Sequence, residues 1–346
     1  MLILSQSDVE RLLPMDACID VMASALVSLA RGDAVLPLRT VILVPGTNDA
    51  FATMPGYLKL RESGEGAGAP ERSETVVGAK VITVFPGNHG TAFDSHQGAV
   101  LLFDPDNGAL AAVLDATPVT AVRTAAVSAV ATRLLAREMA SSLTIIGAGV
   151  QAHEHLEAMC AVRPIRTLRV WSRSQDNAQR LVDAARNQFG LEASIAASGR
   201  DAVHGSEIIC TTTSAREPVL FGEWLSPGAH INAIGASQAS AREIDSLTVI
   251  RSRLYVDRRE SALKEPGDIL VPLQDGDIGP DHIVGEIGEL LIGRAVGRRD
   301  ANEITLFKSL GLAIEDLAAA AYVYGEAVRT GTGVRVELGG ARLAAH

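Results

Sequence analysis

Residues 142–174, SLTIIGAGVQAHEHLEAMCAVRPIRTLRVWSRS, decide the fold of this chain. They begin with an apolar strand, continue through GAGVQA at 147–152 into a helical segment, and return in a second apolar strand that ends in Ser-Arg-Ser. A strand, a glycine-rich turn, a helix and a second strand in this order form the βαβ unit that binds dinucleotides. Glycines at this spacing without those neighbours would indicate only a turn, so the prediction depends on the elements around them.

Each residue of the GAGVQA turn has a place in that prediction. Gly147 permits the tight turn off the strand, and Gly149 lets backbone N–H groups approach a pyrophosphate at the positive end of the helix. Ala152 occupies the third glycine position, where a small residue is permitted. Together with Val150 and Gln151, these residues form the predicted binding site of a nicotinamide dinucleotide.

The tip of the second strand indicates which dinucleotide binds. NAD enzymes usually place Asp or Glu there to bind the ribose 2′-hydroxyl, whereas this chain has Ser172, Arg173 and Ser174. A guanidinium would pair with the 2′-phosphate that a carboxylate would repel, so the pattern favours NADPH. NADH stays the alternative because Asp176 lies close by and could bind a ribose, and Arg173 could be an ordinary surface charge.

Composition and charge exclude several classes of protein. The 346 residues suffice for two domains, and 47% hydrophobic residues with 4% aromatics suit buried parallel strands and packed helices. A net charge of -10 argues against a nucleic-acid partner, because a phosphate backbone needs a basic face. A small anionic substrate is still possible, since local arginines can reverse the potential within a cleft.

Cysteine usage and the N-terminus predict a cytoplasmic protein. Cys18, Cys160 and Cys210 lie far apart in apolar settings, which favours buried thiols in a reducing compartment over disulfides or a metal site. The first residues lack the basic region of a secretory signal, and no apolar run approaches the roughly 18 residues of a membrane-spanning helix. We therefore expect no membrane association.

The first part of the chain is predicted to form a mixed sheet. Residues 15–30 have the apolar spacing of an amphipathic helix that stops at Gly32. Several strands follow without helices between them, which predicts an antiparallel or mixed sheet. These strands are expected at 38–44, 76–85, 98–103 and 109–114. The Gly-, Glu- and Arg-rich residues 61–74 are expected to form a mobile loop.

An Ala-rich helix from residue 117 to about 137 leads into the alternating part of the chain. After the βαβ unit, further strands separated by helices extend the predicted doubly wound parallel sheet. These strands are expected at 206–212, 229–235 and 252–257. A last helix, at about 311–329, could return to the first part of the chain.

Three cations in apolar segments are candidate site residues. Lys80 lies in the strand VVGAKVITVF on the same face as Ile82 and Val84. An unpaired buried ammonium is costly, so Lys80 must lie at an edge, be paired or face a site. Arg39 stands at the start of a strand, and Arg123 lies in the second turn of a helix, where it opposes the macrodipole. An anion partner for Arg123 is therefore favoured over a surface role.

His153 and His155 raise the question of a metal site. Their i, i+2 spacing splays them across a helix, unlike the HExxH motif. We therefore interpret them as a pair on the helix surface and predict no metal site.

Segments along nearly the whole chain together resemble the ornithine cyclodeaminase/mu-crystallin family. They are PLRT at 37–40, AKVITVFPGN at 79–88, SHQGAVLLFDP at 95–105, VTAVRTAAVSAVAT at 119–132, GAGVQA at 147–152, EPVLFGEWLSPGAHINAIGAS at 217–237, YVDRRESALKEPGDIL at 255–270 and ITLFKSLGLAIEDLAAA at 304–320. The later segments are most similar to mu-crystallin-like ketimine reductases.

The resemblance implies an α/β fold, a Rossmann-type doubly wound parallel sheet plus an N-terminal α/β domain, with the active site in the cleft between them. Residues 1–118 with 312–346 would bind the substrate and form a homodimer, and residues 119–311 would bind the dinucleotide. Family members cyclise ornithine or lysine, dehydrogenate alanine, or reduce cyclic ketimines. The 61–74 loop is longer than usual in the family and would cover the cleft or decorate the surface.

The resemblance also implies roles for single residues. Arg39 and Arg123 would grip the substrate carboxylate, and Lys80 would contact that carboxylate or the reacting imine. Two guanidinium forks and an ammonium suit an α-carboxylate. Further contacts to the cofactor would come from Ser95, His96, Thr124, Thr212, Ser237 and Lys308, of which Ser237 would also touch the substrate.

One departure from the family decides between its activities. Ornithine cyclodeaminases carry an aspartate directly after the NA(V/I)GA segment, where this chain has Ser237. A serine without a base cannot accept a proton at neutral pH, so cyclodeaminase activity is disfavoured. A reductase needs less, because a protonated imine is electrophilic and the nicotinamide delivers hydride. Glu265, in the SALKE segment, would supply the proton; otherwise it is a solvated loop carboxylate.

We therefore expect an NAD(P)H-dependent oxidoreductase that reduces a small cyclic ketimine carboxylate, either Δ1-pyrroline-2-carboxylate or Δ1-piperideine-2-carboxylate. The alternatives are ornithine or lysine cyclodeamination, an alanine dehydrogenase-like or imino-diacid reductase reaction, and ligand binding without catalysis.

Overall fold

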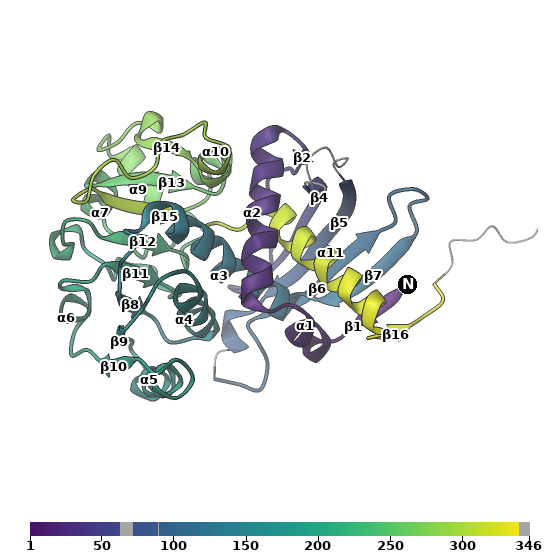
Figure 1. Ribbon diagram of the computed structural model, residues 1–346, viewed down its shortest axis with the longest axis horizontal. Helices are drawn as coiled ribbons and strands as arrows, with labels where there is room; N and C mark the ends of the chain where they lie inside the picture. The colour runs from purple at the N-terminus through teal and green to yellow at the C-terminus, as the bar shows by residue number, and fades with distance from the viewer. Residues whose placement is uncertain (63–71, 89, 339–346) are drawn as a thin grey trace, which may run out of the picture. The chain divides into compact units, whose positions relative to one another are not determined.

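A computed structural model describes residues 1–62, 72–88 and 90–338, and the chain forms two compact units (Figure 1). Unit 1 comprises Met1–Arg123 with Leu312–His346, and unit 2 comprises Thr124–Gly311. Each unit is built on a sheet of its own. The predicted fold class, a parallel sheet plus a second α/β part, is confirmed.

Unit 1 contains a mixed sheet, as the run of strands predicted. Strand β1 runs parallel to β7, and the other neighbours are antiparallel. The strand order is β16-β1-β7-β6-β5-β4-β2, with β3 paired to β4. The strands are β1 (Leu2–Leu4), β2 (Ala34–Val35), β3 (Thr40–Leu43), β4 (Ala50–Glu62), β5 (Arg72–Val84), β6 (His96–Phe103), β7 (Leu110–Asp115) and β16 (Val334–Arg335).

Strand β4 was missed by the sequence prediction, because Pro55 and Gly56 inside it resemble a turn. Proline lacks the N–H that an interior ladder needs. In the structure, β3 pairs with β4 as far as Thr53, and β2 pairs with β4 from Tyr57 onwards. Pro55 therefore lies in the gap between these two neighbours, where its missing N–H breaks no ladder bond on that side.

The loop expected at 61–74 is wrong at both ends. Strand β4 continues to Glu62, and β5 already begins at Arg72. Residues 63–71 lie outside the described part of the chain, so the role suggested for this loop stays a prediction.

Helix α11 packs on β4, β5 and β6 and lies beside α2 (Figure 1). Two glycines that pair across β4 and β5 make room for it. A Cβ atom at Gly56 would lie 3.1 Å from Leu317 Cδ1, and one at Gly78 would lie 2.7 Å from Leu317 Cδ2. A side chain at either position would displace Leu317, and one at Gly78 would also clash with the Leu101 carbonyl oxygen on β6. The helices of unit 1 are α1 (Gln6–Leu12), α2 (Met15–Arg31) and α11 (Ala313–Thr330), with a 3-10 turn at Pro86–Asn88.

The predicted end of α2 is confirmed, since Gly32 adopts the left-handed conformation with a φ of 83°. Among the described residues, no single helix has the length and apolar character to cross a membrane. Only α1 and α2 taken together, bent by 85°, reach that length and composition.

Unit 2 is the doubly wound parallel sheet that the βαβ pattern predicted. The strand order is β10-β9-β8-β11-β12-β15-β13-β14, parallel throughout. Its first five strands therefore lie in the order 3-2-1-4-5 that dinucleotide-binding sheets adopt, with the reversal between β8 and β11. The strands are β8 (Ser142–Ile146), β9 (Thr167–Trp171), β10 (Glu192–Ile195), β11 (Ile208–Thr211), β12 (His230–Ala233), β13 (Ser252–Val256), β14 (Ile283–Glu286) and β15 (Ile304–Lys308).

Helix α3 (Ala116–Leu135), predicted from residue 117 to about 137, begins in unit 1 and ends in unit 2. The other helices of unit 2 connect its strands. They are α4 (Val150–Val162), α5 (Gln175–Phe189), α6 (Gly199–Val203), α7 (Ser246–Ile250), α8 (Arg259–Ala262), α9 (Gly267–Gln274) and α10 (Ile287–Leu291), with 3-10 turns at Gly222–Trp224 and Pro280–His282.

Candidate active site

The turn after β8 has the geometry that a pyrophosphate needs. Gly147 has a φ of 114°, and a Cβ there would lie 2.7 Å from the hydroxyl of Thr212, which follows β11. Gly149 is the N-cap of α4 and provides no side-chain cap. No described atom lies within 4 Å of a Cβ placed on Gly149. Gly149 thus leaves space beside the start of α4, at the sheet edge where the strand order reverses, and this fits a dinucleotide.

The remaining residues of the turn support this geometry. Ala152 is fully buried, as the third small position requires, whereas Val150 is 57% exposed. Thr212 donates its hydroxyl hydrogen to the Ile146 carbonyl at 3.2 Å, which ties β11 to the end of β8.

The tip of β9 places its two serines in local hydrogen bonds. Ser172 accepts a bond from the Ser174 N–H, and Ser174 caps α5 by accepting the Asn177 N–H, each at 3.3 Å. Arg173 is exposed beside them. Sequence reasoning missed a second cation here, Arg180 on α5, whose charge adds to burial in lowering the pKa of His153. Two guanidinium groups therefore lie on the first turns after β9.

Lys308, predicted to touch the cofactor, is fully buried at the end of β15. Its ammonium forms an ion pair with Asp268 at 3.0 Å and donates to the Ala233 carbonyl at 3.2 Å. These contacts hold the carboxyl ends of β12 and β15 together. The contact of Lys308 with a cofactor stays a prediction.

A buried carboxylate that the sequence did not suggest, Glu243, organises the same sheet edge. It accepts bonds from the Thr211 hydroxyl at 2.8 Å, from the Thr213 N–H at 2.5 Å and hydroxyl at 2.8 Å, and from the Gly235 N–H at 2.5 Å. Burial raises its pKa, partly offset by the charge of Lys308. Glu243 thereby fixes the loops after β11 and β12, which carry the predicted contacts Thr212 and Ser237. We therefore interpret Glu243 as a group that positions these two loops.

Ser237 and Glu265 belong to segments that lie together in unit 2. The Gly267 N–H donates to the Gln238 carbonyl at 3.1 Å, so the loop after β12 runs beside the segment that precedes α9. Both Ser237 and Glu265 are partly buried. The role of Glu265 as proton donor, and the alternative of a solvated loop carboxylate, stay predictions.

The other predicted cofactor residues lie on different elements. Ser95 and His96, at the start of β6 in unit 1, are joined by a 3.1 Å bond between the Ser95 hydroxyl and His96 Nδ1. Thr124 is 7% exposed on α3 at the beginning of unit 2. Their contacts with a cofactor stay predictions.

Unit 1 places Lys80 in the middle of its sheet, opposite Met54 on β4 and Val100 on β6. Lys80 is 2% exposed, and its ammonium donates to Asp316 Oδ1 at 3.0 Å and to the Thr120 hydroxyl at 3.1 Å. The sequence predicted that Lys80 lies at an edge, is paired or faces a site. The edge position is wrong, because β5 lies between β4 and β6, and the pairing is confirmed. Burial lowers the pKa of Lys80 to about 8, against the charge of Asp316, which raises it.

Arg123 is bound by two carboxylates on the first turn of α11. Its Nε donates to Asp316 Oδ1 at 2.9 Å, and its Nη1 donates to Glu315 Oε2 at 2.8 Å. The predicted anion partner is thus confirmed, and it belongs to the protein. Although burial raises the pKa of Asp316, the charges of Arg123 and Lys80 hold it below the usual value.

The structure therefore brings all three predicted substrate cations into one cluster in unit 1. Arg39 is near enough for its charge to lower the pKa of Lys80 further. Glu315 and Asp316 complete this cationic cluster, and sequence reasoning missed both. Two adjacent acids at the start of a buried Ala-rich helix were the available signal, because fully buried carboxylates are almost always paired.

The interpretation of His155 as a surface residue is wrong. It is fully buried and bonds the Gln151 carbonyl at 2.7 Å and the Ser128 hydroxyl at 2.9 Å. Burial lowers its pKa to about 4. Cys160 is partly exposed, unlike the two buried cysteines. Within the described ranges, no group of three or more His, Cys, Asp or Glu side chains is arranged for a metal ion.

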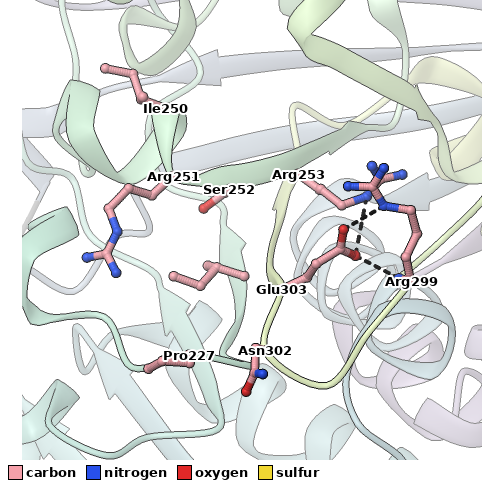
Figure 2. A pocket seen from close by; sticks show the side chains of 9 residues that line it. Pro227, Ile250, Arg251, Ser252, Arg253, Arg299, Asn302 and Glu303 are labelled. Atoms are coloured by element: carbon pink, nitrogen blue, oxygen red, sulfur yellow. Dashed lines mark hydrogen bonds and ion pairs between the residues drawn. The ribbon is translucent and has the colours of Figure 1, made fainter.

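Unit 2 has a pocket of about 440 Å³, which is lined by residues at 227, 250–253, 299 and 302–304 (Figure 2). It opens at Ser252 and Ile304, the first residues of β13 and β15, and thus at the amino edge of the sheet. Glu303 pairs there with Arg253 at 3.6 Å and with Arg299 at 2.6 Å. Because parallel sheets bind ligands at their carboxyl edge, this pocket is not the predicted cofactor site.

Comparison with known sequences identifies the family. The model of the ornithine cyclodeaminase/mu-crystallin family matches residues 1–331. Ketimine reductase mu-crystallin from Mus musculus is 41% identical over 293 residues, 85% of either chain. Delta(1)-pyrroline-2-carboxylate reductase from Bacillus cereus is 35% identical over 338 residues, which are 97% of this chain and 100% of that protein.

Solved structures show the same similarity. Thermococcus litoralis Delta(1)-pyrroline-2-carboxylate reductase, in complex with NADH and L-proline, has 40% sequence identity and a TM-score of 0.90, and the match covers 97% of this chain and 100% of that one. An archaeal alanine dehydrogenase dimer with bound NAD has 31% identity and a TM-score of 0.88, with 97% and 99% covered. This chain belongs to the ornithine cyclodeaminase/mu-crystallin family.

Proposed function

We propose that this protein is an NAD(P)H-dependent reductase of a small cyclic ketimine carboxylate, Δ1-pyrroline-2-carboxylate or Δ1-piperideine-2-carboxylate, and that it forms the cyclic L-amino acid. The observation that carries the proposal is the cationic cluster of unit 1, where Lys80 and Arg123 are buried in a chain that also has a dinucleotide turn. Relatives that are named for this reaction match over nearly the whole chain.

Reduction of a C=N bond adds a hydride to carbon and a proton to nitrogen. A bound nicotinamide supplies the hydride. Arg39 and Arg123 orient the substrate carboxylate, because planar guanidinium groups bind carboxylates through paired bonds. Lys80 contacts the carboxylate or the imine through the ammonium N–H that does not bond to Thr120 or Asp316. Glu265 gives the proton that keeps the imine nitrogen cationic, so that the carbon accepts hydride readily.

The residue after the NAIGA segment favours net reduction over deamination. Cyclodeamination needs a carboxylate there to take protons from the substrate amines, and this chain has Ser237. The loop that carries Ser237 is held by Glu243, whose bonds go to Thr211, Thr213 and Gly235. That carboxylate is fully buried and already accepts four bonds, so it does not replace the missing aspartate.

We propose NADPH as the preferred reductant, with NADH as the alternative. Arg173 supports this preference, because it is exposed next to the ribose position at the end of β9. Arg180, on the first turns of α5, would add a second positive charge for the 2′-phosphate.

We also propose a homodimer in the cytoplasm, with unit 1 as the substrate and dimerisation domain. The archaeal alanine dehydrogenase, a structural relative, is described as a dimer. None of the three cysteines forms a disulfide in the described structure, which suits a reducing compartment.

A steady-state assay tests the proposed reaction. Purified protein should oxidise NADPH, and more slowly NADH, in the presence of either ketimine, and chromatography should identify L-proline or L-pipecolate. The alternatives have their own readouts: ammonia release from ornithine or lysine, ammonia-dependent oxidation with pyruvate or oxaloacetate, and ligand binding without turnover. Absence of turnover with both ketimines and both cofactors would contradict the proposal.

A further inference from the structure

One carboxylate oxygen of Asp316 accepts hydrogen bonds from two buried cations of unit 1, Lys80 and Arg123. Its Oδ1 lies 3.0 Å from the Lys80 ammonium and 2.9 Å from the Arg123 Nε, and the side chain is fully buried. We propose that Asp316 is a positioning residue of the reduction, which keeps Lys80 protonated and aims Lys80 and Arg123 at the substrate. This inference rests on the proposed function and adds to it the group that sets the charge of the site.

The first support is the set of charges that face Lys80. Asp316 approaches from α11, Arg123 from α3, and Arg39 from the segment before β3. Burial and the two guanidinium groups disfavour the ammonium, whereas the carboxylate favours it. The other two charges that act on the pKa of Lys80, those of Arg123 and Arg39, are both positive. Without Asp316 the amine would therefore lose its proton at lower pH and could no longer attract an anionic substrate.

The second support is the number of donors on Lys80. An ammonium has three N–H donors. The Thr120 hydroxyl and Asp316 accept two of them in the described structure. Thr120 in turn donates its own hydrogen to the Ala116 carbonyl at 2.7 Å, which turns its oxygen lone pairs toward Lys80. Two fixed acceptors define the direction of the third N–H, which we assign to the substrate.

Glu315 provides a matched comparison one residue away. Like Asp316 it is fully buried on the first turn of α11 and pairs with Arg123. Glu315 Oε2 also accepts a bond from the Leu312 N–H at 3.0 Å, so it caps the helix, whereas the Lys80 ammonium bonds to Asp316 and Thr120. Removing the charge of Glu315 should therefore disturb Arg123 without changing the protonation of Lys80.

The test is the pH dependence of kcat/KM for Δ1-pyrroline-2-carboxylate with NADPH. In the wild type, activity should fall as Lys80 deprotonates above pH 8 or so. In Asp316→Asn the alkaline limb should move to lower pH by about one unit or more, because the stabilising charge is gone. Activity lost at neutral pH should partly return in acidic buffer. In Glu315→Gln the limb should stay where the wild type has it, while KM rises.

Asp316→Glu keeps the charge and tests its placement. The alkaline limb should stay near that of the wild type, and KM should rise because the longer side chain displaces the two cations. Far-UV circular dichroism and quenching of NADPH fluorescence check that each variant folds and that unit 2 still binds cofactor. If Asp316→Asn does not fold, the smaller neutral variant Asp316→Ser replaces it, and its alkaline limb should move to lower pH in the same way.

Three results would overturn the inference. Asp316→Asn could lower kcat/KM equally at every pH, both neutral variants could shift the limb by the same amount, or Asp316→Glu could shift it as far as a lost charge would. If the wild type turns over no ketimine, the proposed function is contradicted instead, and no pH profile of kcat/KM can be measured. The two failures are therefore distinguishable.

Discussion

Gly147 and Thr212 come so close together that no side chain fits between them. A Cβ on Gly147 would lie 2.7 Å from the Thr212 hydroxyl and 2.8 Å from its carbonyl oxygen, and the backbone there has a φ of 114°. The turn after β8 and the loop after β11 thus meet at the point where the strand order of unit 2 reverses. Gly147 is therefore expected to matter for stability, and Gly149 for binding of the cofactor.

Gly147→Ala should destabilise the protein, and Gly149→Ala should not. Alanine at 147 combines a disfavoured φ with a close contact, at a cost of about 2 kcal/mol or more in the free energy of unfolding. Alanine at 149 meets no described atom within 4 Å and has a φ of -94°, so the fold should tolerate it. Its methyl group would instead fill the space for the pyrophosphate.

Urea unfolding and NADPH titration of the two variants check this separation. Gly149→Ala should keep the wild-type unfolding midpoint but bind NADPH at least about tenfold more weakly, a loss of roughly 1.4 kcal/mol of binding free energy. Unchanged NADPH affinity in Gly149→Ala would mean that the pyrophosphate does not lie over this turn.

Arg173→Ala should weaken NADPH selectively. The variant loses a charge-assisted bond to the 2′-phosphate, which NADH lacks, so kcat/KM should fall about 10-fold to 100-fold with NADPH and change little with NADH. Arg200→Ala, at another exposed arginine of unit 2, is the matched control and should leave both values near the wild type. An equal loss with both cofactors in Arg173→Ala would remove the 2′-phosphate role.

Local patterns were sufficient to predict the elements that depend on near neighbours. The βαβ unit and helix α2 follow from the spacing of apolar residues and from glycines within a few positions. Strand β4 was missed because Pro55 and Gly56 carry a local turn signal that only its neighbours in the sheet override.

The cationic cluster could be predicted only in part. Alternation along β5 required a partner or a site for Lys80, and the position of Arg123 favoured an anion. Neither pattern identifies Asp316, which lies 236 positions from Lys80 in the sequence. Such pairs depend on how α11 packs on the sheet, and this packing depends in turn on Gly56 and Gly78.

Glu265→Gln should slow the chemical step. If Glu265 supplies the proton, the amide cannot, and kcat should fall by about 100-fold or more with little change in KM, because general acid catalysis contributes in this range. Glu260→Gln on the neighbouring helix is the control. Its surface pairs with Arg258 and Lys264 contribute little, so activity should stay near the wild type. A kcat in Glu265→Gln within about threefold of the control would assign the proton to another donor.

Lys80 also predicts how stability depends on pH. Burial lowers its pKa in the folded chain to about 8, from its usual value of 10.5. Between these two values the unfolded chain holds the proton more tightly, so the contribution of Lys80 to the free energy of unfolding rises with pH. Below about pH 8 the buried Lys80 is protonated, and the full cost of burying its charge lowers the free energy of unfolding. Two thiols act in the opposite direction, because burial raises the pKa of Cys160 to about 11 and that of Cys210 to about 12.

The contribution of Lys80 must therefore be measured as a difference between variants that share the same cysteines. Urea unfolding of the wild type and of Lys80→Met should give free energies whose difference changes by roughly 2–3 kcal/mol across the window, in favour of the wild type as pH rises. Lys264→Met, at a lysine whose side chain is 57% exposed, should follow the wild type at a constant offset. If the Lys80→Met difference is equally constant, Lys80 keeps its proton throughout, and the alkaline limb assigned to it belongs to another group.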